Sequence, residues 1–350
     1  MSTAITQGNR SHENGSHENR KNPDHSDNEY KNMIIINSKE FHIEEPCAVA
    51  IGKFDGIHLG HKALFEKLFK HAGHSNDMKT AVFTFNPSAA KFFAEVHGNN
   101  VDDFKEITTL AEKRIIFEKM GIDYLVEYPL DAETAAILPE DFVKDILLDR
   151  MNMKFIAAGY DLSFGYKGAG DVELLMKMAS EYGFETRIID KISFEGREIS
   201  STYLREEIQK GDMEKVTRLL GHPYSFAGRV EKGFKLGRTL GFPTMNLYPD
   251  EEKILPPLGV YYSEVEYEGI IYEGLTNIGM RPTVAKEGDH HISVETYLFD
   301  FDKDMYGKTI ITRLIKYKRP EIRFSSKEEL KRQIQQDLQD GLDFTMKRRT

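Results

Sequence analysis

The chain has 350 residues, more than one hydrophobic core usually holds, and this length indicates two domains. It carries 47 Lys and Arg residues against 57 Asp and Glu residues, a formal net charge of −10. This balance argues against a nucleic-acid-binding protein, because such proteins present basic surfaces to the phosphate backbone. An anionic substrate must then be held by local donors, backbone amides or a metal ion.

The single cysteine, Cys47, excludes an intramolecular disulfide, which is typical of a reducing compartment. No apolar run reaches the roughly 18 residues of a membrane span, and the N-terminus lacks the apolar stretch of a signal peptide. The sequence therefore predicts a cytoplasmic protein that does not associate with membranes. It gives no indication of the oligomeric state.

Residues 1–32 form a polar segment with a short repeated motif, Ser-His-Glu-Asn, and almost no aliphatic side chains. We expect a disordered tail, because so little apolar area cannot offset the loss of chain entropy. Folded structure should begin near Met33, itself a candidate translation start, where Ile34–Ile36 is the first apolar run. The alternative for the tail is a metal-binding role of its histidines, which are His12, His17 and His25.

From Cys47 to about Thr202, short apolar runs alternate with helical patterns, which predicts parallel strands and an α/β layer fold. The expected strands are Ala48–Ile51, Ala81–Phe85, Tyr124–Val126, Phe155–Ala158 and Thr186–Ile189. One helix should begin with a capping box at Thr109 and Glu112 and end at Gly121. Further helices are expected at Pro139–Met151 and Asp171–Tyr182.

The pattern changes near Gly211, where a short helix, Asp212–Leu220, is followed by strand-like stretches. These stretches are Tyr224–Val230, Thr244–Tyr248, Val260–Tyr267, Ile292–Phe299 and Thr309–Ile315. Turn signals stand at Glu268–Gly269 and Glu273–Gly274. Short, regularly spaced strands are typical of an antiparallel barrel or sandwich. A last helix should begin with a capping box at Ser326 and run to about Leu338.

The predicted organisation is therefore a tail and two domains joined by a helix. The boundaries are 1–32 for the polar tail, 33–206 for the α/β domain, 207–222 for the linker helix and 223–350 for the β domain.

The loop after the first strand of the α/β domain holds the first candidate site. Gly56 and Gly60 allow a tight turn and a close approach to a ligand. The helix that follows presents free amides and a partial positive charge, which suit an anion. His58 and His61 are one helical turn apart, so both imidazoles can face the same point. There they could stabilise charge on the phosphates of a nucleoside triphosphate as pyrophosphate leaves.

The alternative for this loop is a pair of structural histidines in an ordinary strand–helix turn, but the glycines and the helix around them favour a functional site. Zinc is less favoured, because no third and fourth ligand follows at suitable spacing. A second phosphate-binding helix start is predicted where Ser201 and Thr202 precede Arg205 by one turn. Taken alone, this motif is equally well a helix cap followed by a surface arginine.

The β domain holds another glycine-rich segment, at 233–246. Its glycines could let a loop fold closely over phosphates. Thr244 and Asn246 are two positions apart on a strand, so they share a face and offer the hard oxygen ligands that Mg²⁺ prefers. A glycine-rich hairpin with a polar face is an equally good interpretation. Glu295 is either an exposed strand residue or a general base.

Two stretches carry a family resemblance in the α/β domain. They read Gly-Lys-Phe-Asp-Gly-Ile-His-Leu-Gly-His at 52–61 and Ile-Ser-Ser-Thr-Tyr-Leu-Arg at 199–205. They resemble the signature of HxGH nucleotidylyltransferases, and more closely the FMN adenylyltransferase module of bacterial bifunctional riboflavin kinase/FAD synthetases. Gly-Tyr-Asp-Leu-Ser-Phe-Gly at 159–165 is similar to an internal motif of that module.

This resemblance implies a Rossmann-like domain that converts ATP and FMN into FAD and pyrophosphate, with His58 and His61 on the phosphates. The implied ATP or phosphate contacts are Gly52, Asp55, Gly56, Gly60, Ser201, Thr202 and Arg205. The implied flavin contacts are Asn86, Asp161 and Arg281. The chain departs from the family at 86–88, where Asn-Pro-Ser replaces a Pro-His-Pro-like run.

In the β domain, Gly-Arg-Thr-Leu-Gly-Phe-Pro-Thr-Met-Asn at 237–246 is similar to the riboflavin kinase signature. The similarity implies a six-stranded antiparallel β-barrel with a C-terminal helix. It also implies that Thr244 and Asn246 bind Mg²⁺ with ATP and that Glu295 activates the riboflavin 5′-hydroxyl. Met245, where the family usually has Ala, should point away from the metal. The implied ATP contacts of the loop are Gly233, Gly237, Arg238 and Gly241.

Three alternatives to a bifunctional enzyme remain open at this point. The chain could be a riboflavin kinase whose adenylyltransferase domain is inactive, or a flavin-binding regulator without activity. It could also be an HxGH adenylyltransferase that acts on another phosphorylated cofactor precursor, although this would leave the β domain unexplained.

Overall fold

The computed structural model describes residues 32–73, 77–100, 104–233, 241–282 and 290–349. The tail expected at residues 1–32 lies outside the described residues apart from its last position. The alternative that its histidines bind a metal also concerns residues outside the described part. Gly237 and Arg238 also lie outside them.

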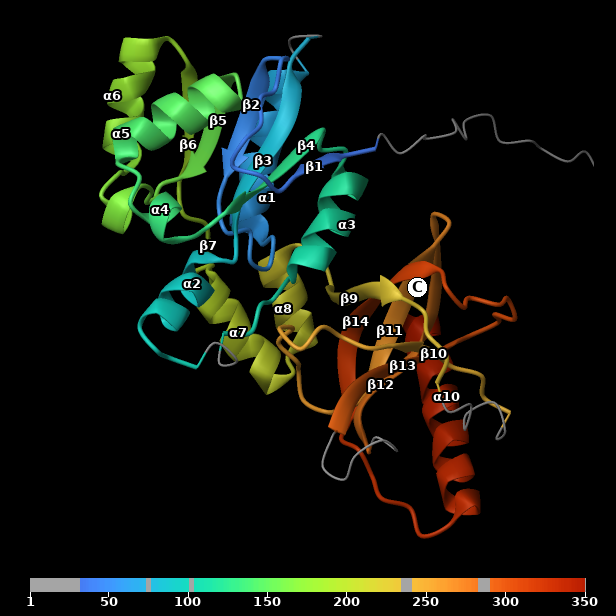
Figure 1. Cartoon of the computed structure of the whole chain (residues 1–350). Coiled ribbons are helices and arrows are strands. Elements are labelled where there is room, and N and C mark those ends of the chain that lie inside the picture. The colour runs from blue at the N-terminus through green and yellow to red at the C-terminus, as the bar shows by residue number, and fades with distance from the viewer. Residues whose placement is uncertain (1–31, 74–76, 101–103, 234–240, 283–289, 350) are drawn as a thin grey trace, which may run out of the picture. The chain divides into compact units, whose positions relative to one another are not determined.

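The first of two six-stranded sheets lies in the N-terminal half and is parallel throughout (Figure 1). Its strand order is β1-β4-β3-β2-β5-β6, and every neighbouring pair is parallel. The strands are β1 (Ile34–Ile36), β2 (Cys47–Ile51), β3 (Lys79–Asn86), β4 (Tyr124–Pro129), β5 (Met153–Gly159) and β6 (Glu185–Ile189). The predicted α/β fold is confirmed.

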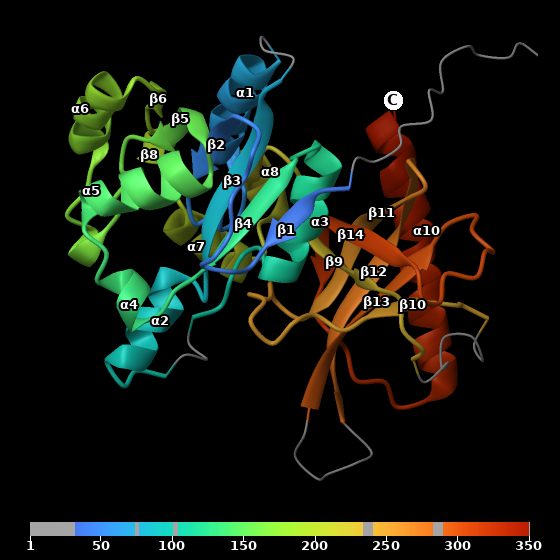
Figure 2. The same ribbon diagram turned by 45° about the horizontal axis from the view of Figure 1, so that its top comes forward.

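Helices cover both faces of this sheet (Figure 2). The helices of this half are α1 (Leu59–Ala72), α2 (Ala89–Val96), α3 (Leu110–Met120), α4 (Ala132–Ala135), α5 (Pro139–Asp141), the π-helical η2 (Phe142–Arg150), the short η3 (Tyr166–Gly168) and α6 (Val172–Tyr182), of which α1, α3, η2 and α6 share core clusters with the sheet. Along β2, Ala48 and Ala50 share a core with α1 and α3, whereas Val49 shares one with η2 and α6. Because successive side chains of a strand point to opposite faces, β2 must be apolar at every position.

Local sequence sets the helix ends of this half. Thr109 accepts a hydrogen bond from the amide of Glu112, whose carboxylate accepts one from the amide of Thr109, so α3 begins with the predicted capping box. Gly121 and Gly183 end α3 and α6 in the left-handed conformation. The predicted helix at Pro139–Met151 is formed by α5 and η2 together.

The second sheet is antiparallel, curled and six-stranded, in the order β10-β13-β12-β11-β14-β9 (Figure 1). Its strands are β9 (Tyr224–Arg229), β10 (Met245–Leu247), β11 (Gly259–Tyr267), β12 (Ile270–Pro282), β13 (His290–Leu298) and β14 (Thr309–Arg319). A bridge between Glu231 and Asn246 joins segments at its two edges, and α10 (Lys327–Arg349) packs against β12. This agrees with the barrel-type sheet and C-terminal helix implied by the resemblance.

Two details of this half differ from the prediction. The turn expected at Glu273–Gly274 is wrong, because both residues lie within β12. Glycine is needed at 274 for another reason: a Cβ there would overlap the backbone carbonyl of Tyr297 on the neighbouring strand. The last helix is also longer than expected, since α10 continues past Leu338 to Arg349 and is anchored to β14 by the Arg319–Asp337 ion pair.

A small hairpin and two helices join the sheets. The hairpin is β7 (Ser193–Phe194) with β8 (Arg197–Glu198), and the helices are α7 (Ser201–Lys210) and α8 (Met213–Leu220). Leu204 of α7 and Leu219 of α8 belong to the same core cluster as Tyr261 of β11; α8 packs against β9 and β14, and α7 packs against α8. None of the helices that the structure describes is both long and apolar enough to cross a membrane.

Candidate active sites

The first candidate site lies at the end of β2, in the loop that leads into α1. Gly56 has a φ of +96°, a conformation that L side chains rarely adopt, and a Cβ there would lie 3.1 Å from the Leu204 side chain. His58 is the N-cap of α1, and its side chain makes no capping hydrogen bond. The first-turn amides of α1 therefore remain available to an anion.

His58 and His61 are brought together as the spacing predicts. Their rings stack with centroids 3.9 Å apart and planes 22° apart. The ring of His61 also lies 5.2 Å from the ring of the buried Phe54. The Nδ1 atoms of both histidines are buried and have no hydrogen-bond partner among the described residues. Such groups are costly inside a protein unless a ligand satisfies them.

Burial keeps both imidazoles neutral. Loss of solvent lowers the pKa of His58 to about 4, against the opposing charges of Asp55 and Asp161. Burial lowers the pKa of His61 well below its ordinary value, and the neighbouring His58 and Lys113 lower it further. At neutral pH each ring therefore carries one proton and can donate one hydrogen bond to a phosphate.

Asp55 is the structural centre of this loop. Its carboxylate accepts hydrogen bonds from the amides of Ile107 (2.7 Å) and Thr108 (3.2 Å) and forms an ion pair with Arg205. Its backbone carbonyl accepts a hydrogen bond from the Ser201 hydroxyl at 2.9 Å. The second predicted motif is thus held against the first. The Arg205 guanidinium is bound to Asp55 in this structure, and a phosphate contact by Arg205 stays a prediction.

The other residues predicted to contact ATP or the flavin in this half lie on several different elements. Gly52 follows β2, Gly60 lies in the first turn of α1, and Thr202 is exposed on α7. Asn86, the last residue of β3, and Asp161, two residues after β5, are both exposed, and these two strands flank β2. They share the carboxyl edge of the sheet with the histidine loop, where such folds bind ligands.

The second candidate site lies on neighbouring antiparallel strands. Asn246 on β10 stands opposite Glu295 on β13, which in turn stands opposite Asn277 on β12. Directly paired residues project from the same face of a sheet, so the three side chains are neighbours. Ser293 adds a hydroxyl 3.4 Å from the Glu295 carboxylate. Asn277 was not predicted as a site residue, although it begins a stretch, Asn-Ile-Gly-Met-Arg-Pro-Thr at 277–283, that resembles the riboflavin kinase family.

The Asn246 side chain is suited to bind a ligand. It is only 4% exposed, and its Oδ1 atom has no hydrogen-bond partner among the described residues. Its Nδ2 atom donates to the backbone carbonyl of Thr244 at 3.4 Å. Gly233 approaches it so closely that a Cβ would lie 2.6 Å from the amide group. Met245 is 9% exposed and packs in the core, away from this face, as expected.

Other residues of the predicted kinase loop are less defined. Thr244 is partly buried, and Gly241 is exposed with a φ of +90°. The backbone of Arg281 pairs with His291, and its side chain lies outside the described part. In that described part, no group of three or more His, Cys, Asp or Glu residues could hold a metal ion.

Comparisons with known proteins match both halves. The family model of FAD synthetase matches residues 40–203, and that of riboflavin kinase matches residues 220–345. Proteins named bifunctional riboflavin kinase/FMN adenylyltransferase are similar along most of their length. The one from Escherichia coli K12 is 37% identical (86% of this chain, 93% of the relative), and that from Listeria monocytogenes is 34% identical (85% and 92%).

Bacillus subtilis has a relative with the same name that is 32% identical, covering 85% of this chain and 92% of the relative. A crystal structure titled as a macrolide-efflux protein from Streptococcus pneumoniae has a TM-score of 0.71 at 30% identity, covering 87% of this chain and 97% of that one. This match supports the arrangement of strands and helices.

Proposed function

Because the chain belongs to the family of bifunctional riboflavin kinases/FMN adenylyltransferases, we propose that it phosphorylates riboflavin to FMN and then adenylylates FMN to FAD. ATP is the co-substrate of both reactions. The observation that carries the proposal is that the two family models match successive parts of the chain, and each part holds its own cluster of polar side chains. A regulator without activity would not need two such clusters.

We assign FMN adenylylation to the loop after β2. A phosphate oxygen of FMN attacks the α-phosphorus of ATP, and the bond from that phosphorus to the leaving pyrophosphate breaks. His58 and His61, both neutral, would donate hydrogen bonds to the phosphates as negative charge develops on them. The first-turn amides of α1 would add to this stabilisation. Asp55, Ser201 and Arg205 fix the shape of the loop.

Contacts with the flavin are proposed at the same edge of the sheet. Asn86 ends β3 and Asp161 follows β5, the strands on either side of β2, so both would lie at the same sheet edge as a flavin whose phosphate lies at the histidines. Arg281 stays a prediction from the resemblance.

We assign riboflavin phosphorylation to the face that carries Asn246 and Glu295. The Glu295 carboxylate would accept the proton of the 5′-hydroxyl as that oxygen attacks the γ-phosphorus of ATP, while ADP leaves. Thr244 and Asn246 would hold Mg²⁺, which when bound neutralises charge on the ATP phosphates. The buried Asn246 Oδ1 atom fits this role, since it is a hard oxygen that lacks a protein partner among the described residues.

Product analysis tests the proposal directly. The full chain is incubated with riboflavin, ATP and Mg²⁺, and the flavins are separated by chromatography. We expect FMN to appear first and FAD afterwards. FMN without FAD would indicate a riboflavin kinase whose adenylyltransferase half is inactive. Bound riboflavin without any product would indicate a flavin-binding protein without activity.

A further inference from the structure

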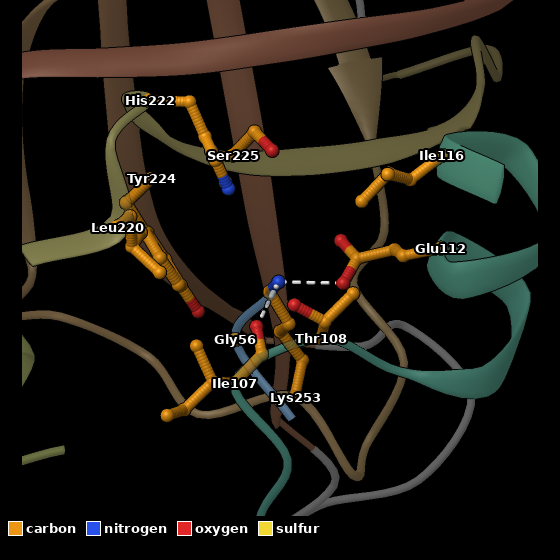
Figure 3. A pocket seen from close by; sticks show the side chains of 10 residues that line it. All are labelled: Gly56, Ile107, Thr108, Glu112, Ile116, Leu220, His222, Tyr224, Ser225 and Lys253. Carbon is orange, nitrogen blue, oxygen red and sulfur yellow. Dashed lines mark hydrogen bonds and ion pairs between the residues drawn. The ribbon is translucent and has the colours of Figure 1, made fainter. Parts of the chain in front are cut away.

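The junction between the histidine loop and the antiparallel sheet contains a buried charge that neither reaction uses. Lys253, on the segment after β10, is 4% exposed. Figure 3 shows its side chain directed at Glu112 of α3, beside Gly56, Ile107 and Tyr224. The cavity among these side chains measures about 10 Å³, the volume of a single water at most. The place is therefore a packed junction and not a ligand site.

Lys253 is bound from several sides. Its Nζ atom lies 2.5 Å from the Glu112 carboxylate and donates to the backbone carbonyl of Ile107 at 2.6 Å. The ammonium also lies 4.6 Å from the centre of the Tyr224 ring. Burial lowers the pKa of this amine, and the Glu112 carboxylate opposes that change. A buried ion pair usually contributes little to the free energy of folding, so stability alone does not explain why this pair is present.

The Ile107 carbonyl belongs to the segment that holds the histidine loop. The amides of Ile107 and Thr108 donate to the carboxylate of Asp55, which lies three residues before His58. The other side of the same segment is bound to the chain around Lys253. Backbone hydrogen bonds join Glu106 to Glu252 (2.6 Å) and to Ile254 (2.9 Å).

The other end of this connection leads to the second site. Lys253 follows the end of β10 by six residues, and β10 carries Asn246. The segment 250–254 is fixed to the antiparallel sheet, since the Tyr224 hydroxyl donates to the carbonyl of Ile254 at 2.6 Å. A continuous series of contacts thus runs from the kinase half through Lys253 to Asp55.

We propose that Lys253 is a positioning residue for FMN adenylylation, which holds the 106–108 segment, and through it Asp55 and the histidine loop, in the reactive geometry. The adenylyltransferase site is therefore completed by the kinase half of the same chain. The inference rests on the proposed assignment of this reaction to His58 and His61.

The test uses Lys253→Met in the full chain, which keeps the length of the side chain and removes the ammonium. We expect kcat for FAD formation from supplied FMN to fall by about ten- to a hundredfold, because small displacements of catalytic groups are costly. KM for FMN should change much less, and riboflavin phosphorylation should stay within about twofold of the parent. The retained kinase activity also shows that the chain is folded.

A second variant separates positioning from stability. Lys253→Met alone leaves a buried carboxylate without its cation, which is destabilising. Lys253→Met combined with Glu112→Gln removes both charges. The glutamine oxygen can still accept from the amide of Thr109, while the amide of Ala227 loses the acceptor that Glu112 provides. We expect the same loss of kcat, measured at a temperature at which both the double variant and the parent are fully folded. The matched control is Lys105→Met. It removes an exposed hydrogen bond from the Lys105 ammonium to the backbone carbonyl of Glu251, which lies two residues before Lys253, and it should leave both activities unchanged.

The outcomes distinguish the inference from the assignment on which it rests. A folded double variant with the parent's kcat for FAD formation would overturn the positioning role, as would an equal loss of both activities. His61→Ala is measured in parallel. If it lowers FAD formation while the Lys253 variants do not, only the positioning role fails. If His61→Ala has no effect, the assignment of the site itself is wrong.

Discussion

The two candidate sites of this chain are built in different ways. The histidine site lies on a loop after a parallel strand, and its shape depends on partners far along the chain, such as Arg205, which lies 150 residues from Asp55. The Glu295 site lies on adjacent antiparallel strands, where register alone places Asn246 opposite Glu295. A site fixed by strand register should respond mainly to changes in its own residues. A site fixed by remote contacts should also respond to distant ones.

The largest expected effect is at Glu295. Glu295→Gln removes the proposed base while keeping its size, so riboflavin phosphorylation should fall by about 10²- to 10⁴-fold. FAD formation from supplied FMN should persist, since the base has no part in it. Both rates are measured by chromatography of the flavins. The matched control is Glu264→Gln on β11, whose carboxylate pairs with Arg348 at the sheet surface. Loss of both activities in Glu295→Gln would show that the sites are not independent.

His61→Ala should have the reverse effect. Removing one donor to the developing phosphate charge is expected to lower kcat for FAD formation by about 10²- to 10³-fold. Riboflavin phosphorylation should not change, because the proposed kinase residues Asn246 and Glu295 lie on β10 and β13, whereas His61 lies on α1. His97→Ala, at an exposed histidine after α2, is the control. A comparable loss in both histidine variants would remove the special role of His61.

Asn246→Ala should produce a smaller change, confined to the kinase. The buried Oδ1 atom is a proposed metal ligand, so its loss should raise the Mg²⁺ concentration for half-maximal phosphorylation by about tenfold. The rate is measured over a Mg²⁺ titration at fixed ATP. EDTA should stop the reaction in the parent. An unchanged Mg²⁺ requirement in Asn246→Ala would contradict metal binding by this residue.

The sequence predicts those parts of the fold that depend on local interactions. The capping box at Thr109, the helix ends at Gly121 and Gly183 and the strand runs all depend on residues a few positions apart. The pair Glu273–Gly274 looks like a turn in the sequence. Glycine is needed at 274 because the backbone of Tyr297 lies close to it, and this is a tertiary contact that local sequence does not reveal.

The same distinction between local and remote contacts applies to the candidate sites. Helical spacing predicts that His58 and His61 meet, since both lie on one turn. Nothing local indicates that Lys253 pairs with Glu112, 141 residues away, because any charged residue on a loop is ordinarily exposed. The resemblance supplies the proposed reacting residues, but the residues that support them become visible only in three dimensions.

The smallest expected effect is a change of stability with pH that arises at the histidine site. The pKa of His58 in the folded chain, about 4, lies below the ordinary value of 6.5. As pH falls below about 6.5, the unfolded chain binds the proton first, so the free energy of unfolding decreases until about pH 4. Between pH 7 and 5.5 the loss should be about 1 kcal/mol for this residue, with a further loss from His61. Urea denaturation at the two pH values measures it, and His58→Gln should reduce the difference. If neither His58→Gln nor His61→Ala reduces the pH dependence, the imidazoles of the histidine loop are not its source, and this loop would be as insensitive to its surroundings as the strands that carry Glu295.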